Sequence, residues 1–138
     1  MSKPLKILVL EDSEADFLLL KNHLHQQGVA AECRRISTPA ETHAALAEGG
    51  WDIVLSDYNL PGVDIEGLLD GLATSHPELP VILVSGSIGE ERAVEMLRRG
   101  VCDFILKDNL ARLAPAIQRS RQDAVQRRAR QEAEAALR

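Results

Sequence analysis

The sequence predicts an α/β fold in which a doubly wound sheet of five parallel strands carries helices on both faces. Short apolar runs alternate five times with longer segments whose apolar residues recur at helical spacing. The runs are nearly continuous in apolar residues, which is typical of parallel strands that helices cover on both sides. The length of 138 residues suits one domain with a core of its own.

The first strand and helix are predicted within residues 5–28. The run LKILVL at 5–10 is apolar enough for a buried strand. The next segment begins with Ser13, whose side chain suits a helix cap, and stops at Gly28. Its apolar side chains are expected to face the sheet, and they are Phe17, Leu20 and Leu24.

The middle of the chain predicts two further strands, each followed by a helix. AECRRI at 31–36 predicts a weaker strand, and the next helix has Thr38 as its cap, a proline directly after it and glycines at its end. WDIVLSD at 51–57 predicts the third strand. DIEGLLDGLATSH at 64–76 predicts a helix that its glycines weaken.

The last two strands are predicted from PVILVS at 80–85 and CDFILK at 102–107. The segment between them, GEERAVEMLRRG at 89–100, predicts a short helix. A final helix is expected to begin near Leu113. Pro115 is tolerated in its first turn because a backbone N–H would have no helical partner there.

The C-terminal segment 115–138 differs from the rest of the chain in charge. It carries 6 basic and 3 acidic side chains, a net charge of +3, whereas residues 1–114 carry 10 basic and 18 acidic ones, a net charge of −8. An acidic body indicates that the chain does not bind nucleic acid directly. As a helix the segment would extend about 36 Å, too far to pack entirely on so small a domain. Two interpretations stay open: a solvated or frayed end, or a connector helix that leads to a partner or another domain.

Polar side chains stand at the ends of four predicted strands: Glu11 with Asp12, then Asp57, Ser85 and Lys107. A parallel sheet brings these ends to one edge, where binding sites lie in such folds. Three carboxylates close together raise one another's pKa unless a cation intervenes. Because a few carboxylates with open water positions suit Mg²⁺, the sequence predicts a magnesium site.

The same strand ends predict a place for a phosphoryl group. Mg²⁺ and the ammonium of Lys107 would neutralise the transferring oxygens, and the hydroxyl of Ser85 would donate a hydrogen bond. Carboxylates serve as phosphoryl acceptors and form aspartyl phosphates. Asp57 is the candidate acceptor because it stands at the middle of the cluster.

Four motifs, in this order along the chain, resemble the receiver domain of two-component response regulators: LVLEDS, DIVLSDYNLPG, VILVSGS and GVCDFILK. The resemblance covers residues 5–120. It implies a flavodoxin-like sheet with the strand order 2-1-3-4-5. We therefore expect a receiver domain at 1–120 and a helical extension or linker at 121–138.

The resemblance also implies roles for particular residues. Asp57 would accept a phosphoryl group from a phosphohistidine on a sensor histidine kinase or phosphotransfer protein. Asp12, Asp57 and the backbone carbonyl of Asn59 would hold Mg²⁺, with Glu11 acting through water. Ser85 and Lys107 would contact the phosphoryl group.

Phe104 matches the aromatic switch of the family, which swings inward when the hydroxyl residue moves. The phosphoryl group would draw Ser85 and the loop at 86–90 inward, and so change the surface of the fourth helix, fifth strand and fifth helix. A downstream effector protein or fused domain would read that surface, and a homodimer is a further expectation. The chain would be a switch that promotes its own phosphoryl transfer and dephosphorylation, not an enzyme acting on a metabolite.

Two features depart from the family pattern. Lys107 is followed by Asp108 instead of proline, which predicts a trans peptide bond and a different turn. The segment GVDIEGLLDG at 62–71 predicts an irregular start to the third helix.

Ordinary structural roles also fit single residues. Glu11 and Asp12 would favour the positive end of the following helix, and Glu14 and Asp16 are expected to be first-turn acids. Phe104 fits a simple core position as well as a switch. The four histidines show no ligand spacing and are expected at the surface.

Two other functions are less favoured. A small Mg²⁺-dependent phosphatase or nucleotidyl-transfer domain usually has an Asp-x-Asp pair, whereas this chain has Asp57-x-Asn59 and lacks room for a cap domain. A degenerate receiver that binds partners without phosphorylation would not need all the key groups that are present. A DNA-binding regulator is not expected, since no helix-turn-helix follows the receiver within these residues.

Cys33 and Cys102 stand alone in apolar stretches without metal spacing. We expect small buried hydrophobic residues in a reducing compartment. The chain has no apolar run of membrane-spanning length and opens with no signal peptide. These features predict a cytoplasmic protein with no membrane contact.

Overall fold

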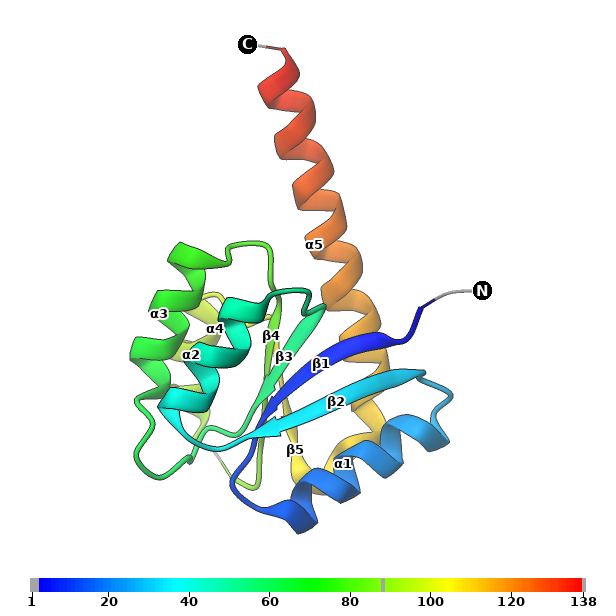
Figure 1. The fold of residues 1–138 in the computed structure, drawn as a ribbon, viewed down its shortest axis with the longest axis vertical. Coiled ribbons are helices and arrows are strands. Elements are labelled where there is room, and N and C mark those ends of the chain that lie inside the picture. Colours follow the sequence, from blue (N-terminus) through cyan, green and yellow to red (C-terminus); the bar gives the residue numbers. More distant parts are fainter. Residues whose placement is uncertain (1–2, 88, 138) are drawn as a thin grey trace.

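The computed structural model describes residues 3–87 and 89–137. Its five strands form one parallel sheet in the order β2-β1-β3-β4-β5 (Figure 1). The predicted fold class and strand order are therefore confirmed. The strands are β1 (Leu5–Leu10), β2 (Ala31–Ile36), β3 (Ile53–Ser56), β4 (Val81–Ser85) and β5 (Asp103–Leu106). Each lies within the run predicted for it.

Helices cover both faces of the sheet (Figure 1). The α-helices are α1 (Glu14–Gln26), α2 (Pro39–Glu48), α3 (Ile65–Ser75), α4 (Glu90–Arg98) and α5 (Leu113–Ala136). α1 and α5 pack on one face, while α2, α3 and α4 pack on the other. α3 forms where it was predicted, despite its two glycines.

The core has two layers because side chains alternate across each strand. In β1, Ile7 and Val9 join the cluster beneath α1 and α5, and Leu8 and Leu10 join the cluster beneath α2, α3 and α4. β1, β3 and β4 lie in the middle of the sheet, and the residues of β3 and β4 are all buried. The continuous apolar runs of the sequence therefore correspond to strands that are covered on both sides.

Helix starts follow the sequence signals in the first two helices. The hydroxyl of Ser13 accepts a hydrogen bond from the backbone N–H of Asp16, and that of Thr38 accepts one from Glu41. α3 starts after Asp64, whose side chain makes no capping hydrogen bond. α1 ends before Gly28, whose φ of 79° suits a residue without a side chain.

The segment after β5 contains an element that sequence patterns did not predict, the 3₁₀ helix η1 (Lys107–Arg112). The peptide bond after Lys107 is trans, as predicted. α5 then starts without a side-chain cap of its own. Gln27, at the end of α1, compensates because its amide nitrogen donates to the carbonyl of Leu110 at 3.1 Å and its amide oxygen accepts from the N–H of Ala114 at 3.1 Å.

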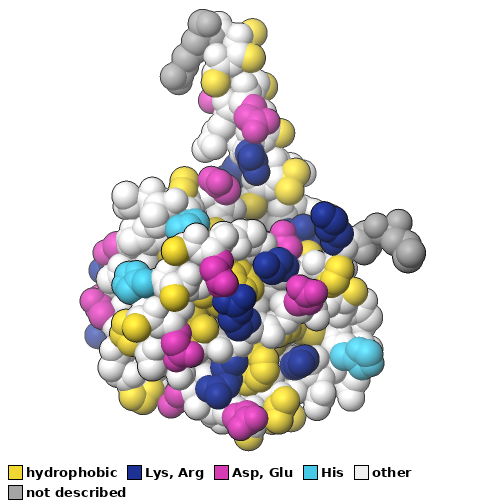
Figure 2. Space-filling view, viewed as in Figure 1, with side chains coloured by type: hydrophobic (Ala, Val, Ile, Leu, Met, Phe, Trp, Pro, Cys, Tyr) yellow, Lys and Arg dark blue, Asp and Glu magenta, His cyan; other side chains and the backbone are white. Residues whose placement is uncertain are grey.

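α5 continues through residue 120 without interruption and projects from the body of the molecule (Figure 1). Its buried residues lie in its first half, and every described residue from 126 to 137 is exposed. Side chains of both charge signs are visible on the projecting part and on the viewed face of the body (Figure 2). Within the described residues, no helix is both long and apolar enough to cross a membrane.

The two cysteines are half-buried, less than the full burial expected of them. Cys33 and Cys102 both pack against the core layer beneath α1 and α5. Cys33 lies on β2, which is an edge strand and pairs with a neighbouring strand on one side only. The edge position explains why its burial is incomplete.

Candidate functional site

The carboxyl ends of β1 and β3 bring Glu11 and Asp57 next to each other. Leu10 pairs with Ser56 in the parallel register, so the residues that follow leave the sheet side by side. The backbone N–H of Asp57 donates to the carbonyl of Leu10 at 2.9 Å, which extends the ladder by one residue. The backbone therefore fixes Asp57 at the edge of the sheet.

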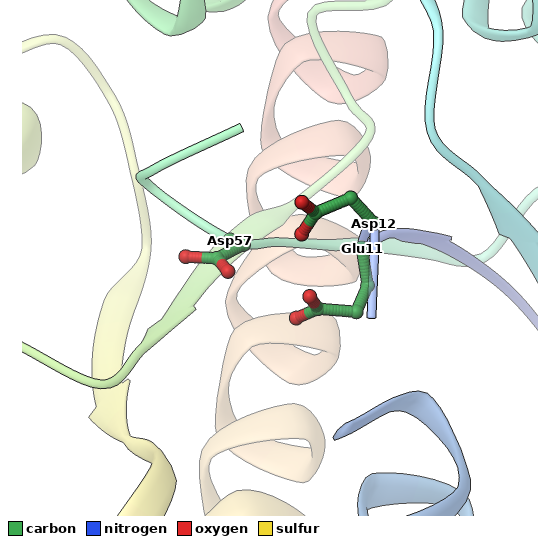
Figure 3. A group of neighbouring side chains, drawn as sticks. All are labelled: Glu11, Asp12 and Asp57. Carbon is green, nitrogen blue, oxygen red and sulfur yellow. The ribbon is translucent and has the colours of Figure 1, made fainter. Parts of the chain in front are cut away.

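Glu11, Asp12 and Asp57 form a group of carboxylates at this edge (Figure 3). One oxygen from each lies within 4.8 Å of the others. Glu11 is 5% exposed and Asp57 is 7% exposed, whereas Asp12 is exposed. The predicted carboxylate cluster thus exists, with two members buried and one open to solvent.

Lys107 supplies positive charge to the two buried carboxylates. Its Nζ lies 2.8 Å from Oε2 of Glu11 and 2.9 Å from Oδ2 of Asp57. A third ion pair, of 2.7 Å, joins it to Oδ2 of Asp16. Burial alone would lower the pKa of Lys107, but hydrogen bonds to Asp16, Glu11 and Asp57 outweigh burial and raise that pKa. The side chain is therefore a fixed cation at neutral pH.

Glu11 retains an electrostatic conflict despite this ion pair. Burial raises its pKa, and the hydrogen bonds from Lys107 and from the N–H of Ser13 only partly offset that effect. The charge of Asp57 raises the pKa further. A cation among the three carboxylates would relieve this conflict, and their oxygens are the ligands that Mg²⁺ prefers. The residues present therefore fit a magnesium ion.

Asn59 continues the site from the loop after β3. Its backbone N–H donates to Oδ1 of Asp57 at 3.1 Å. Because Lys107 contacts Oδ2, the two oxygens of Asp57 have different partners. The side-chain amide of Asn59 donates to the carbonyl of Ser87 at 3.4 Å, which links this loop to the one after β4.

Ser85 is the last residue of β4, and Phe104 lies on the neighbouring strand β5. Ser85 is fully buried, and its hydroxyl donates to the carbonyl of Ser87 at 3.2 Å. Phe104 is half-buried and packs against the core layer beneath α2, α3 and α4. Residue 88, within the loop at 86–90 that is expected to move, lies outside the described residues.

Asp16 is the residue of this site that sequence reasoning missed. Its place in the first turn of α1 indicated only a role at the helix start. The structure adds an ion pair with a lysine that is 91 residues away in the chain. Helical spacing could have suggested that Asp16 faces the edge of the sheet, but no sequence pattern could have identified its partner.

The arrangement combines the carboxylate of Asp57, the fixed positive charge of Lys107 and a cluster of carboxylate oxygens that suit a hard metal ion. A carboxylate in this setting is suited to receive a phosphoryl group, since the amine and a divalent cation would neutralise the charge of the transferring oxygens. The exposed Asp12 leaves the cluster open to solvent, from which a phosphodonor would approach.

The chain belongs to the response regulator receiver domain family, whose pattern matches residues 7–118. It is therefore a signalling switch of the two-component type, as the sequence motifs indicated.

Curated relatives support the same assignment. The chain is 35% identical over 113 residues to the response regulator protein FleR of Pseudomonas aeruginosa, and the match covers 78% of this chain and 22% of FleR. It is 31% identical over 101 residues to the DNA-binding transcriptional regulator NtrC of Escherichia coli K12, with 73% of this chain and 21% of NtrC covered. The chain thus spans about a fifth of the length of these relatives.

Solved structures share the fold. The receiver domain of NtrX from Brucella abortus is 35% identical, with a TM-score of 0.67, and the match covers 81% of this chain and 98% of that one. A CheY-like receiver domain protein from Methanospirillum hungatei JF-1 has a TM-score of 0.77 at 24% identity, covering 91% of this chain and 99% of that one. The beryllofluoride-activated NtrC4 receiver domain, solved as a dimer, has a TM-score of 0.76 at 21% identity, covering 86% and 95%.

Proposed function

We propose that Asp57 is the phosphoryl acceptor of this receiver and that a sensor histidine kinase or phosphotransfer protein is its donor. The observation that carries this proposal is the position of the Asp57 carboxylate. It is buried at the end of β3, lies 2.9 Å from the Lys107 ammonium, and shares a group of three carboxylates with Glu11 and Asp12. An isolated aspartate at a strand end would not need these neighbours.

Mg²⁺ is the proposed cofactor, held by Asp12, Asp57 and the backbone carbonyl of Asn59, with Glu11 acting through water. When bound, it would neutralise charge on the transferring phosphoryl oxygens. The grouping of the three carboxylates and the raised pKa of Glu11 support the assignment.

In the transfer, a carboxylate oxygen of Asp57 forms a bond to phosphorus as the bond from phosphorus to the histidine nitrogen breaks. The electron pair of the broken bond stays on the imidazole. Lys107, already beside Oδ2 of Asp57, neutralises the phosphoryl oxygens without moving far. Later attack by water releases inorganic phosphate and restores the carboxylate. The domain thus promotes its own transfer and dephosphorylation.

Ser85 would couple phosphorylation of Asp57 to a conformational change. Its hydroxyl donates to the carbonyl of Ser87, so a phosphoryl oxygen that attracts this hydroxyl would free the loop after β4. Phe104, which is half-buried on the neighbouring strand, would then turn inward as the switch residue. The output surface would be that of α4, β5 and α5.

Exposed apolar side chains support that output surface. Val94 and Leu97 on α4 are each 46% exposed, and Leu106 at the end of β5 is 36% exposed. A downstream effector protein, a fused domain or a second copy of the chain would cover them.

We assign residues 1–120 to the receiver, assign residues 121–138 to a connecting extension, and place the protein in the cytoplasm.

The test uses the full chain with Mg²⁺ and acetyl phosphate, followed by intact-protein mass spectrometry. The wild-type protein is expected to gain one labile phosphoryl group. Asp57→Asn should abolish this gain because an amide cannot form the acyl phosphate. Asp52→Asn is the matched control, since Asp52 lies at the opposite end of β3 and binds the N–H of Lys6. An unchanged mass gain in Asp57→Asn would refute the assignment.

A further inference from the structure

We propose that Asp16 is a positioning residue, which holds the Lys107 ammonium beside Asp57 through the phosphorylation cycle. The inference rests on the proposed function of Asp57. It starts from the ion pair between Asp16 Oδ2 and Lys107 Nζ, which at 2.7 Å is the shortest of the three that the ammonium makes.

The three carboxylates around Lys107 differ in what else they would bind. An ammonium has three donors, and Glu11, Asp16 and Asp57 provide an acceptor for each. Glu11 and Asp57 also belong to the carboxylate group that would hold the cation, whereas Asp16 does not. Asp16 is therefore the partner of Lys107 that neither the cation nor the phosphoryl group would engage.

This difference matters once phosphorus is attached. The bridging oxygen of an acyl phosphate carries less charge than a carboxylate oxygen, so Asp57 becomes a weaker acceptor for Lys107. A lysine side chain is long and flexible, and an ammonium with few partners is readily drawn into water. Asp16 keeps one strong acceptor in place, so the amine stays within reach of the phosphoryl oxygens.

The backbone of Asp16 is itself held by hydrogen bonds at the start of α1. Its backbone N–H donates to the hydroxyl of Ser13 at 3.2 Å, at the start of α1. The N–H of Ser13 in turn donates to Oε1 of Glu11 at 3.0 Å. The start of α1 and the carboxylate cluster are thus connected, and Lys107 joins them from η1. A group fixed in this way can orient its partner with little loss of entropy on reaction.

The alternative is that Asp16 only stabilises the start of α1. Glu14 lies in the same first turn and would contribute to the helix in the same way. Glu14 is exposed, and the three ion pairs of Lys107 go to other residues. Comparing the two positions therefore separates a role at the helix start from a role through Lys107.

The experiment measures phosphoryl incorporation from acetyl phosphate into the full chain at saturating Mg²⁺, by intact-protein mass spectrometry over time. Asp16→Ala is expected to slow incorporation about three- to tenfold, because a charge-assisted hydrogen bond to the amine is lost. Asp16→Asn keeps an acceptor oxygen and should fall between Asp16→Ala and wild type. Glu14→Gln should react at the wild-type rate.

Two further readouts separate the possible causes. Raising Mg²⁺ tenfold should not restore Asp16→Ala, whereas a lost metal ligand would be compensated by more metal. Thermal unfolding should shift at least as far in Asp16→Asn as in Glu14→Gln, since both remove a first-turn charge and only Asp16→Asn weakens the ion pair with Lys107. A normal rate in Asp16→Ala, an equal slowing in Glu14→Gln, or recovery at high Mg²⁺ would overturn the inference. Absence of incorporation in the wild-type protein would instead refute the proposed function.

Discussion

At the residue scale, the site depends on two buried carboxylates that share one cation. Glu11 and Asp57 would each lose hydration at a large free-energy cost without a partner. Lys107 provides that partner, so the protein tolerates acidic groups beside its core. The sequence predicted the convergence of these three residues, because residues that follow parallel strands leave the sheet at one edge. The sequence could not predict the ion pair between Asp16 and Lys107 or the hydrogen bond from Ser85 to Ser87, since both depend on the direction of the side chains.

Replacing Lys107 by alanine should reduce phosphorylation far more than metal binding. The variant keeps all the proposed metal ligands, but it loses the charge that neutralises the transferring oxygens. We expect phosphoryl incorporation from acetyl phosphate to fall by at least about tenfold. Mg²⁺ affinity, measured by isothermal titration calorimetry, should not fall, because no proposed ligand is lost and a neighbouring positive charge is removed. A loss of Mg²⁺ affinity with normal incorporation would reverse the assigned roles.

Lys107→Ala should also lower the free energy of unfolding, measured in urea in the absence of Mg²⁺. Glu11 and Asp57 would be left buried without their cation, which costs about 1–3 kcal/mol. Lys21→Ala removes the same charge from an exposed position on α1 and serves as the control.

At the element scale, the helices show how far local signals determine structure. Ser13 and Thr38 cap α1 and α2 as their positions indicated, because N-capping needs only residues close in the chain. η1 and the support from Gln27 were not predictable in this way. Gln27 contacts Leu110 across 83 residues, so this support exists only once α1 and α5 are packed together.

Thr38→Ala should destabilise α2. Its hydroxyl accepts from the N–H of Glu41 at 3.2 Å, and losing such a cap costs about 1 kcal/mol. The free energy of unfolding, measured in urea, is expected to fall by that amount. Thr38→Ser retains the hydroxyl and should behave like wild type; an equal loss in both variants would exclude capping as the cause.

The side chain of Glu41 gives this cap a pH dependence. The hydroxyl of Thr38 lowers the pKa of Glu41, with help from the N–H of Ser37. The stabilisation is therefore present above the ordinary glutamate pKa and is lost as pH falls through the lowered value. In Thr38→Ala, an NMR titration should show the pKa of Glu41 moving up toward its ordinary value.

At the scale of the whole molecule, two core layers support the sheet, and the functional site lies at the edge formed by the carboxyl ends of its strands. α1 and α5 cover one face of the sheet and the other three α-helices cover the opposite face, which leaves the strand ends accessible. α5 extends beyond this body, and its exposed half contributes no buried residue to either layer. The fold of the body should therefore not depend on that half.

Ending the chain after Val125 tests this directly. Residues 126–137 are exposed, so their removal should leave the melting temperature and near-UV circular dichroism nearly unchanged. Ending it after Ala116 is the contrasting control, because that removes the buried Ile117 and Ser120. If the chain that ends at Val125 melts at a clearly lower temperature than the full chain, the extension packs on the body in solution.

The sequence by itself determined the α/β class, the order of elements along the chain and the edge at which the acidic residues gather. Those features follow from periodicity, capping and the geometry of parallel strands, all of which are local or repeat along the chain. Only the tertiary structure decided that Lys107 binds Asp16 as well as Glu11 and Asp57, and that Gln27 supports the start of α5. Such contacts join residues far apart in sequence, and they form only when packing has fixed the direction of each side chain.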